Sequence, residues 1–348
     1  MKILITGAAG FLGYHLTHYL LDKGYEIIGL DIADFPKGDY PEEMKKFKID
    51  VRDKDRVEEL LINEKPNQIV HAAAALPLWP KHDIFTTNVD GTKNILDLAL
   101  KHNIERVVFI SSTAVYGVPK VHPILEEHPL VGVGNYGLSK IEAEKICEEY
   151  RKKNLCVPII RPKTFIGPAR LGVFEILFDW VHDNKKIPVI GNGENKYQLL
   201  DVYDLCEAIY LTLIKDKALA NDTFNVGAME FTTVKNDLET FFRKINSKSR
   251  VLKTPAGLVK FFLAIFNYLK LSPLYKWVYD TADKDSFVST EKIQKTLDWK
   301  ASYSNQDAFF RAYNWYLEHY QEVKSAGEGI THRKAWKQGI LRLIKRFM

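Results

Sequence analysis

Residues 1–13 read MKILITGAAGFLG, and this stretch decides the fold. Its apolar run Ile3 to Ile5 predicts a buried strand, and an apolar pattern of helical spacing begins at Phe11. Between them, Gly7 permits a tight turn, Gly10 lets a pyrophosphate approach the backbone, and Gly13 lets the helix pack close to the strand. The free N–H groups at the start of this helix, around Phe11 and Leu12, suit phosphate oxygens. Strand, glycine turn and helix in this order predict a dinucleotide site.

The composition is that of a soluble globular protein with one large or two closely joined domains: 348 residues, 46% of them hydrophobic and 27% charged. The scattered cysteines Cys147, Cys156 and Cys206 form neither a disulfide framework nor a metal site, and they suit a reducing compartment. No apolar run reaches membrane-spanning length, and no leader precedes the first strand. We therefore expect a cytoplasmic protein without a metal.

Charge is distributed unevenly along the chain. The net charge is +5, but residues 331–348 carry six cations and no acidic residue. The remainder is close to neutral, which argues against general nucleic-acid binding.

Asp31 ends the second predicted strand, Glu26 to Leu30, about twenty residues after the glycine turn. A carboxylate at this point accepts hydrogen bonds from the adenosine ribose hydroxyls and repels a 2′-phosphate. Ile32 supplies no compensating cation. The sequence therefore favours NAD over NADP.

Strands and helices alternate through the first half of the chain. The expected strands are 2–5, 26–30, 46–49, 68–70, 106–110 and 156–160, and the expected helices are 11–23, 54–63, 84–102 and 136–153. This alternation predicts a doubly wound parallel sheet whose ligands bind beyond the carboxyl ends of the strands. His71 falls at one such end and has no partner at metal spacing, so we interpret it as a hydrogen-bonded structural histidine. The alanines beside it suit the close approach of a flat ring or a sugar.

Tyr136 and Lys140 stand four residues apart and so share one face of a predicted helix. A nearby ammonium and the positive charge of an oxidised nicotinamide lower the pKa of a tyrosine, which is otherwise about 10. Tyr136 could then take a proton from a substrate hydroxyl while hydride leaves for the cofactor. Lys140 would tune the tyrosine and hold the nicotinamide ribose, and Ser112 would hydrogen-bond the substrate oxygen.

These motifs together resemble the extended short-chain dehydrogenase/reductases, in particular the NAD-dependent epimerase/dehydratase group. The matching segments are residues 6–13, Asp31, Asp50-Val51, His71 to Ala74, Asn88 to Thr92, Ser111 to Gly117, Tyr136 to Lys140, Arg161-Pro162 with Gly167-Pro168, and Ser289 to Trp299. The resemblance covers about residues 1–322. It implies a Rossmann fold, a two-fold homodimer through the helices starting near Ile84 and Tyr136, and a set of NAD contacts. We place those contacts at Gly7, Gly10, Phe11, Leu12, Gly13, Asp31, Asp50, Val51, Ala72, Ala73, Ala74, Asn88, Ser111, Lys140 and Pro162.

The resemblance also narrows the reaction. The dehydratases and decarboxylases of this group carry a carboxylate directly after the active-site Ser or Thr, whereas this chain has Thr113 and Ala114 there. These positions look like those of the sugar-nucleotide 4-epimerases, which oxidise the substrate to a ketone and reduce it on its other face. A plain dehydrogenase needs the same residues, so the 4-epimerase reaction is favoured rather than shown.

Two departures from the sugar-nucleotide enzymes concern the substrate. Thr164 stands where an Asn is frequent, and Tyr197 stands where an Arg usually grips the diphosphate. Arg170 and Lys196 could substitute as phosphate contacts, and Thr113 is a further candidate substrate contact. The alternative is a substrate without a diphosphate, as in the 3β-hydroxysteroid dehydrogenase-like branch, which acts on an apolar alcohol or ketone. A non-catalytic NAD-binding scaffold is a third, less favoured possibility.

Two apolar segments near the end of the chain remain to be placed. The run Leu258 to Leu271 suits either the core or an apolar edge of the substrate site. The tail 332–348 places Trp336, Ile340, Leu343, Ile344 and Phe347 on one helical face, with cations on much of the rest. Such a tail either contacts an anionic membrane surface, packs on the protein's own body or stays solvated.

The expected organisation is a Rossmann domain over 1–162, to which the chain returns around 196–227. A smaller C-terminal α/β substrate domain follows over 163–330, and a basic amphipathic tail over 331–348. The expected partners are NAD, a small-molecule substrate of the nucleotide-sugar class and a second copy of the chain.

Overall fold

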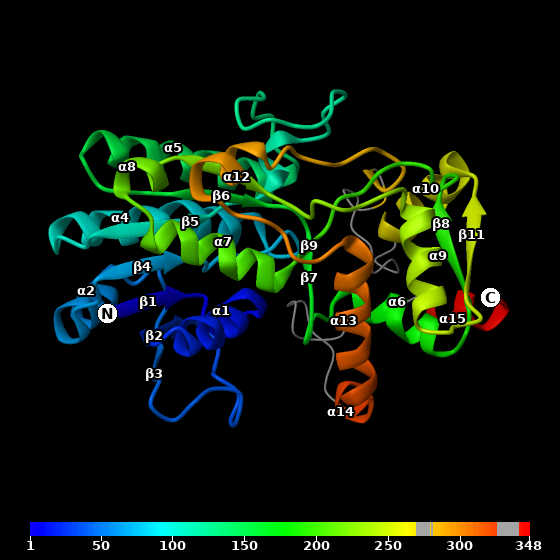
Figure 1. Cartoon of the computed structure of the whole chain (residues 1–348), viewed down its shortest axis with the longest axis horizontal. Helices are drawn as coiled ribbons and strands as arrows, with labels where there is room; N and C mark the ends of the chain where they lie inside the picture. The colour runs from blue at the N-terminus through cyan, green and yellow to red at the C-terminus, as the bar shows by residue number, and fades with distance from the viewer. Residues whose placement is uncertain (269–278, 280, 326–340) are drawn as a thin grey trace.

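The computed structural model describes residues 1–268, 279, 281–325 and 341–348. Its larger part is a parallel sheet of seven strands with helices on both faces (Figure 1). The strands are β1 (Lys2–Thr6), β2 (Glu26–Asp31), β3 (Lys45–Lys48), β4 (Gln68–His71), β5 (Arg106–Ile110), β6 (Ile159–Pro162) and β10 (Thr223–Val226). Their order in the sheet is β10-β6-β5-β4-β1-β2-β3. The order reverses between β1 and β4, which is where doubly wound folds bind their ligands. The predicted fold class is confirmed.

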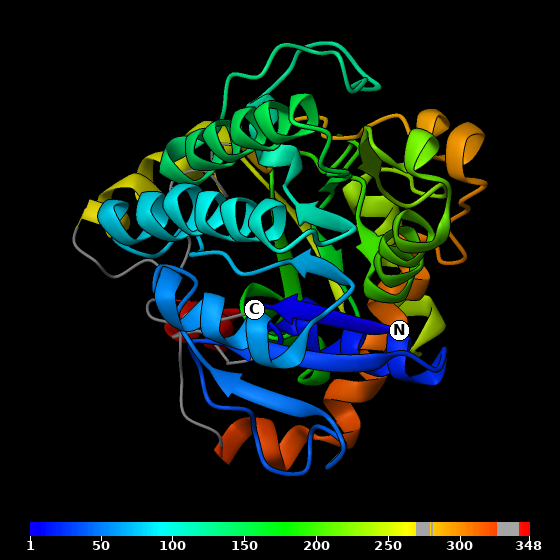
Figure 2. The ribbon, with the colours of Figure 1, turned by 90° about the vertical axis from the view of Figure 1, so that its left-hand side faces the viewer.

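Alternating side chains of β1 supply two separate cores. Ile3 and Ile5 face the layer formed by α1 (Phe11–Asp22) and α7 (Val202–Ile214). Leu4 faces the opposite layer, which is built from α2 (Lys54–Glu64), α4 (Gly91–Lys101) and α5 (Gly134–Lys152). Figure 2 shows α4 and α5 running side by side along this second face. Because both faces are covered, the central strands are buried throughout.

The smaller part of the molecule lies beyond the carboxyl edge of this sheet (Figure 1). It contains two short parallel sheets: β8 (Lys186–Ile190) with β11 (Arg250–Thr254), and β7 (Phe165–Ile166) with β9 (Leu200–Asp201). A third core joins α6 (Val173–His182), α9 (Val234–Lys244) and α13 (Asn305–Glu318). The remaining helices are α3 (Lys81–Phe85), α8 (Lys217–Ala220), α10 (Ala256–Tyr268), α12 (Glu291–Leu297), α14 (Tyr320–Ser325) and α15 (Leu341–Ile344).

Two predicted boundaries are wrong. The strand expected from Cys156 begins only at Ile159, because Pro158 has no N–H to donate, although its carbonyl still accepts from Phe109 at 2.8 Å. The helix expected over 84–102 is interrupted by a π-helical turn, Thr86–Asp90. Such turns are frequent at functional sites, and this one carries Asn88.

The described end of the tail packs on the protein's own body. Leu341, Ile344 and Met348 contact the third core, and Lys345 pairs with Asp179 at 2.5 Å and Asp183 at 2.7 Å. Leu343 and Phe347 are exposed. Trp336 and Ile340 of the expected apolar face lie outside the described residues. No helix within the described ranges is long and apolar enough to cross a membrane.

Candidate active site

A cavity of about 540 Å³ lies at the carboxyl edge of the large sheet. The ends of β1 to β5 and the loops after them form its wall. The predicted site residues that line it are Gly7, Gly10, Phe11, Leu12, Gly13, Asp31, Asp50, Val51, Ala72, Ala73, Ala74, Ser111, Tyr136 and Lys140. Residues from six separate segments of the sequence therefore meet in one cavity.

The three glycines of the first turn face three different constraints. Gly7 has a φ of +73°, and a Cβ there would lie 2.8 Å from the Ala73 nitrogen. A Cβ on Gly13 would lie 2.2 Å from the Gly7 carbonyl oxygen, so α1 could not approach β1 as it does. A Cβ on Gly10 would meet only that same oxygen, at 3.1 Å. Gly10 therefore keeps the cavity side of the turn open rather than relieving a clash in the protein.

Asp31 joins the end of β2 to the glycine turn. Its carboxylate accepts from the N–H of Ala9 at 2.9 Å and from the N–H of Ala33 at 2.8 Å. Burial raises the pKa of Asp31, and these backbone hydrogen bonds oppose the rise. Asp31 thus stands beside the turn that would hold the phosphates, as an adenosine-ribose contact requires.

Asn88 does not line the cavity, unlike most of the predicted NAD contacts. Its side chain is fully buried, accepts from the Ala75 N–H at 2.8 Å and donates to the Ala75 carbonyl at 3.1 Å. It also donates to the Ser139 hydroxyl at 3.0 Å. The structure thus places Asn88 behind the alanine segment, where it positions Ala72 to Ala75.

His71 also supports the alanine segment, through contacts with two threonine hydroxyls. Its Nδ1 lies 2.7 Å from the Thr6 hydroxyl and its Nε2 lies 3.0 Å from the Thr92 hydroxyl. Thr92 donates to the Asn88 carbonyl, so we assign the imidazole proton to Nε2, and Nδ1 then accepts from Thr6. Burial lowers the pKa of His71 to about 3, with a contribution from the Lys140 charge. His71 is a neutral, fully hydrogen-bonded structural histidine, as expected.

Ser112, Tyr136 and Lys140 meet at the end of β5. Lys140 is buried, and its ammonium donates to the Ile110 carbonyl at 2.8 Å and lies 6.0 Å from the centre of the Tyr136 ring. Ser112 follows β5 and accepts from the Ala114 N–H at 3.1 Å. The structure thus brings together three residues that are up to 28 positions apart in the sequence.

The pKa of Tyr136 departs from the sequence-based expectation. Burial raises it to about 12, although the hydrogen bond with Ser112 lowers it. Burial also lowers the pKa of Lys140 to about 8. In the protein alone the phenol is therefore protonated, and only a further positive charge beside the ring would favour the phenolate.

A buried ion pair lies behind Ser111, at this end of the cavity. Glu144 accepts from Arg161 at 2.6 Å and also from the hydroxyl of Ser111. The Arg161 guanidinium further donates to the Tyr116 hydroxyl at 2.7 Å. Glu144 is thus fully engaged behind Ser111. Pro162, predicted as an NAD contact, is buried, and its carbonyl accepts from the Thr113 hydroxyl at 3.3 Å rather than lining the cavity.

The predicted substrate contacts scatter around the site. Thr164 and Tyr197 do meet, with their hydroxyls 2.9 Å apart. Arg170 packs among aromatic rings, 5.1 Å from the centre of the Phe11 ring. Lys196 is exposed, with its ammonium 5.9 Å from the Phe287 ring centre.

Four side chains in or near the site are not among the residues predicted from the sequence. Arg52, Trp79 and Phe165 also line the cavity, and Arg52 grips Asp50 at 2.6 Å. Burial of Asp50 would raise its pKa, but the hydrogen bonds and charge of Arg52 hold it below its usual value. The fourth is Lys163, a buried cation directly after β6. The sequence signal for Arg52 is its place beside Asp50-Val51, and that for Lys163 is its place between Pro162 and Thr164.

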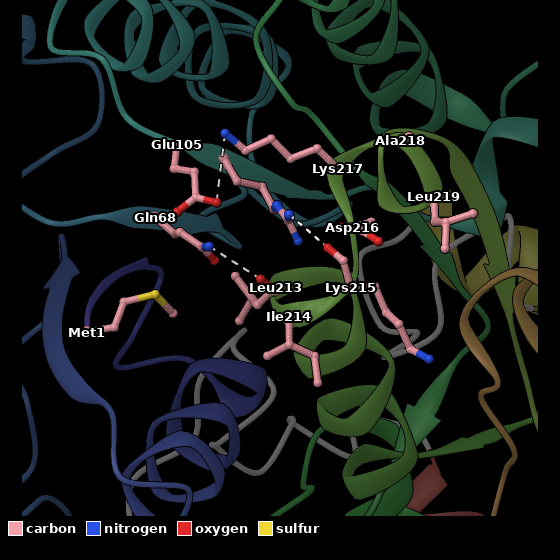
Figure 3. Close-up of a pocket in the computed structure, with 11 residues that line it drawn as sticks. Met1, Gln68, Glu105, Leu213, Ile214, Lys215, Asp216, Lys217, Ala218 and Leu219 are labelled. Atoms are coloured by element: carbon pink, nitrogen blue, oxygen red, sulfur yellow. Dashed lines mark hydrogen bonds and ion pairs between the residues drawn. The ribbon is translucent and has the colours of Figure 1, made fainter.

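A second, more open cavity of about 910 Å³ lies at the opposite, amino edge of the sheet (Figure 3). Two of its polar side chains, Arg106 and Gln68, contact the last turn of α7. Arg106 donates to the Lys215 carbonyl at 2.9 Å and to the Thr212 carbonyl, and Gln68 donates to the Leu213 carbonyl at 3.3 Å. These contacts satisfy carbonyls at a helix end and indicate a structural role.

Comparison with known proteins identifies the family of this chain. The family model described as NAD dependent epimerase/dehydratase matches residues 3–227. This chain belongs to the NAD-dependent epimerase/dehydratase family.

An uncharacterized protein, y4nG, of Sinorhizobium fredii is 33% identical over 98% of this chain and 85% of its own length. A putative UDP-glucose 4-epimerase of Methanocaldococcus jannaschii is 28% identical over 90% of this chain and 97% of its own. The UDP-glucose 4-epimerase of Thermotoga maritima, solved with UDP-glucose, superposes with a TM-score of 0.77 at 22% identity, over 92% of this chain and 100% of its own.

As a member of this epimerase/dehydratase family, the chain is an NAD-dependent enzyme. This finding removes the possibility that it is a non-catalytic NAD-binding scaffold. The residues present fit NAD. Gly10 leaves space that a Cβ would fill, Asp31 stands at the adenosine end, and Lys140 and Tyr136 stand at the other. Strands β2 and β5 are three strand spacings apart in the sheet, which is about 14 Å. This distance suits an extended dinucleotide.

Proposed function

We propose that this enzyme epimerises a hydroxyl-bearing carbon of a nucleotide-sugar, in the manner of a 4-epimerase. NAD supplies the hydride acceptor and donor. Ser112 and Tyr136 hold the substrate oxygen between them, Tyr136 removes its proton and later returns it, and Lys140 holds the ribose. The positive charge of an oxidised nicotinamide beside the Tyr136 ring would favour the phenolate. The reaction ends with NAD in its starting state, so no second substrate is required.

The observation that carries this proposal is where the carboxylates lie. Among the described residues that line the cavity, the acidic ones are Asp31, Asp34 and Asp50. Asp31 ends β2, Asp34 follows it and Asp50 follows β3, so all three lie at the adenosine side of the sheet. Beside Ser112 stands Thr113, whose hydroxyl is bonded to the Pro162 carbonyl. Elimination of water needs a carboxyl group or a similar acid and base at the reacting carbon, and the described wall offers only Tyr136 and Lys140 there.

The test is to incubate the purified enzyme with UDP-glucose, UDP-glucuronate and dTDP-glucose and to follow each by NMR. We expect an isomer of one substrate to form without accumulation of NADH. Tyr136→Phe should keep its NAD content, measured after denaturation, and lose at least about a thousandfold in turnover. Turnover close to wild type in this variant would remove Tyr136 from the mechanism. Release of water or stoichiometric NADH would replace epimerisation with dehydration or net oxidation.

One observation favours a second function, oxidation or reduction of an apolar alcohol or ketone. Helix α10 exposes Leu258, Phe261, Phe262 and Ile265, which recur at helical spacing on one side. An apolar surface of this kind would suit an apolar substrate. Turnover of a hydrophobic secondary alcohol with NADH formation, and no effect of UDP on the melting temperature, would favour this function.

We also propose that two copies associate through α3, α4 and α5, as the family resemblance implies. Exposed Leu100 on α4 and Leu138 on α5 support this assignment. Light scattering of the purified protein tests it: the mass of a dimer is expected, and Leu138→Glu should shift it towards a monomer. A monomeric wild-type protein would refute it.

A further inference from the structure

Lys163 lies next to the described cavity, outside its wall, and the proposed chemistry does not use it. It directly follows Pro162, whose carbonyl accepts from Thr113 beside Ser112. Its own N–H donates to the Val226 carbonyl at 2.9 Å, which fixes the backbone at the carboxyl edge of the sheet. The residue therefore lies at the carboxyl edge of the sheet, two positions before Phe165, which lines the cavity.

The environment of Lys163 is unusual for an ammonium group. The residue is 3% exposed, and its Nζ donates to the Ser286 hydroxyl at 2.6 Å. The same Nζ lies 5.0 Å from the centre of the Tyr197 ring. Within the described ranges, no carboxylate lies at ion-pair distance from it. Burial alone lowers the pKa of Lys163 to about 7.

Such a cation costs stability unless an anion compensates for its lost hydration. Arg161, two residues earlier, shows how this protein treats a buried cation that is structural, because it is paired with Glu144 in a bidentate geometry. Lys163 has only a hydroxyl and an aromatic face. A methionine would fill the same volume at lower cost, so the charge has no evident structural reason.

The neighbours of Lys163 supply the rest of an anion site. Thr164 and Tyr197 are half-buried, and their hydroxyls lie 2.9 Å apart. One hydroxyl donates to the other, which leaves the second O–H free to donate to a ligand oxygen. Lys196, the surface lysine proposed from the sequence, is turned towards Phe287 instead. Lys163, by contrast, is buried and packs against the Tyr197 ring of this hydroxyl pair.

We propose that Lys163, with Thr164 and Tyr197, binds an anionic group of the substrate, either the diphosphate or a carboxylate on the sugar. The assignment rests on the proposed nucleotide-sugar function. The anion would supply the partner that the protein itself does not provide, and Lys163 would thereby contribute to the choice of substrate.

The experiment compares wild type with Lys163→Met, Lys163→Arg and the exposed neighbour Lys196→Met. Calorimetry measures the dissociation constants of UDP, UDP-glucose and UDP-glucuronate for each protein with its NAD bound. We expect Lys163→Met to weaken binding at least tenfold, Lys163→Arg to restore most of it, and Lys196→Met to leave it unchanged. An equal loss for UDP and UDP-glucose assigns the diphosphate, and a loss confined to UDP-glucuronate assigns the sugar carboxylate.

Two further readouts separate binding from a structural role. The melting temperature of Lys163→Met without nucleotide should equal or exceed that of wild type, because an uncompensated charge has been removed. At about pH 8, binding to wild type should take up about one proton, since an anion raises the pKa of a lysine that is largely neutral there. The titratable groups facing it, Tyr197 and His122, are unchanged in the variant, so the uptake should disappear with Lys163.

The outcomes that overturn the inference are distinct from those that overturn the function. If wild type binds a nucleotide-sugar and Lys163→Met binds it equally well, Lys163 has no role in recognition. If Lys163→Met merely melts at a lower temperature with unchanged affinities, the lysine is structural. If wild type binds none of the three ligands, the proposed function fails, and the assignment of Lys163 fails with it.

Discussion

The glycine turn offers the sharpest test of how this sequence builds its cofactor site, through Gly10→Ala and Gly13→Ala. Both changes add one methyl group to the same turn, three residues apart. At Gly13 the methyl would lie 2.2 Å from the Gly7 carbonyl oxygen and 2.5 Å from the Ala8 Cα, which are backbone atoms that cannot rotate away. At Gly10 it would meet a single protein atom, at 3.1 Å, and otherwise project into the cavity.

These geometries predict different free-energy costs. Overpacking against backbone costs about 3 kcal/mol, and alanine recovers about 1 kcal/mol of helix propensity in α1. Gly13→Ala should therefore lose about 2 kcal/mol, or about 3 °C for a chain of this length. Gly10→Ala changes a helix N-cap and should cost less than about 1 kcal/mol of stability. Its methyl would instead strike the pyrophosphate, and a steric cost of about 1–3 kcal/mol weakens NAD about ten- to a hundredfold.

The assay measures the melting temperature of NAD-free protein and, separately, the NAD affinity by calorimetry. Gly257→Ala in α10 is the matched control, because a Cβ there meets nothing within 4 Å. We expect Gly10→Ala to melt at the wild-type temperature and to bind NAD more weakly. Gly13→Ala should melt at a lower temperature and should also bind NAD more weakly. If Gly10→Ala bound NAD as tightly as wild type, the pyrophosphate would not pass over this turn, and the placement of the cofactor would be wrong.

Three further predictions follow from individual contacts. Asn88→Ala leaves the N–H and C=O of Ala75 without partners, so unfolding by urea should show a loss of about 3 kcal/mol, and NAD affinity should fall because the alanine segment loosens. His71 has a folded pKa of about 3, below the value of about 6.5 in an unfolded chain, so stability is lost as the pH falls. Between about pH 7.5 and about pH 5.5 the free energy of unfolding should fall by about 1.4 kcal/mol. A His71→Gln variant should not show this loss. Lys345→Met removes the cation between two aspartates and should cost about 2 kcal/mol by thermal unfolding, whereas exposed Arg346→Met should cost nothing measurable; equal effects would show that the tail is not docked through Lys345.

The cofactor half of the site could be predicted from the sequence because its signals are local. Gly7, Gly10 and Gly13 act within one turn, and Asp31 ends the next strand of the same βαβ unit. A parallel sheet then brings strand ends together without further information, which is how Ser112 reaches the helix that carries Tyr136. The pKa of Tyr136 was not predictable in the same way, because it depends on burial by segments that share no pattern with the Tyr-x-x-x-Lys motif.

Residue type was a poor guide wherever a side chain has two possible partners. Asn88 matches a family motif that predicts an NAD contact, yet its amide bonds the backbone of Ala75. This arrangement still serves the cofactor, since Ala72 to Ala74 form part of the cavity wall. A sequence motif therefore indicated that Asn88 belongs to the site without indicating on which side of the wall its side chain lies.

The substrate half depends on contacts between segments far apart in the chain, and this is why Lys196 was proposed and Lys163 was not. Lys163 meets Ser286 across 123 residues, and Thr164 meets Tyr197 across 33. Which of two lysines faces the site is decided by how β6, the segment before β9 and the segment before α12 pack together, and no periodicity in any one of them encodes that packing. A cation sought at position 197 by analogy is instead supplied from the end of β6, 5.0 Å from the ring that occupies that position. For the proposed nucleotide-sugar substrate, the positive charge would thus come from a different strand, so the residue that recognises the substrate can be identified only in the folded structure and not from one position of the sequence.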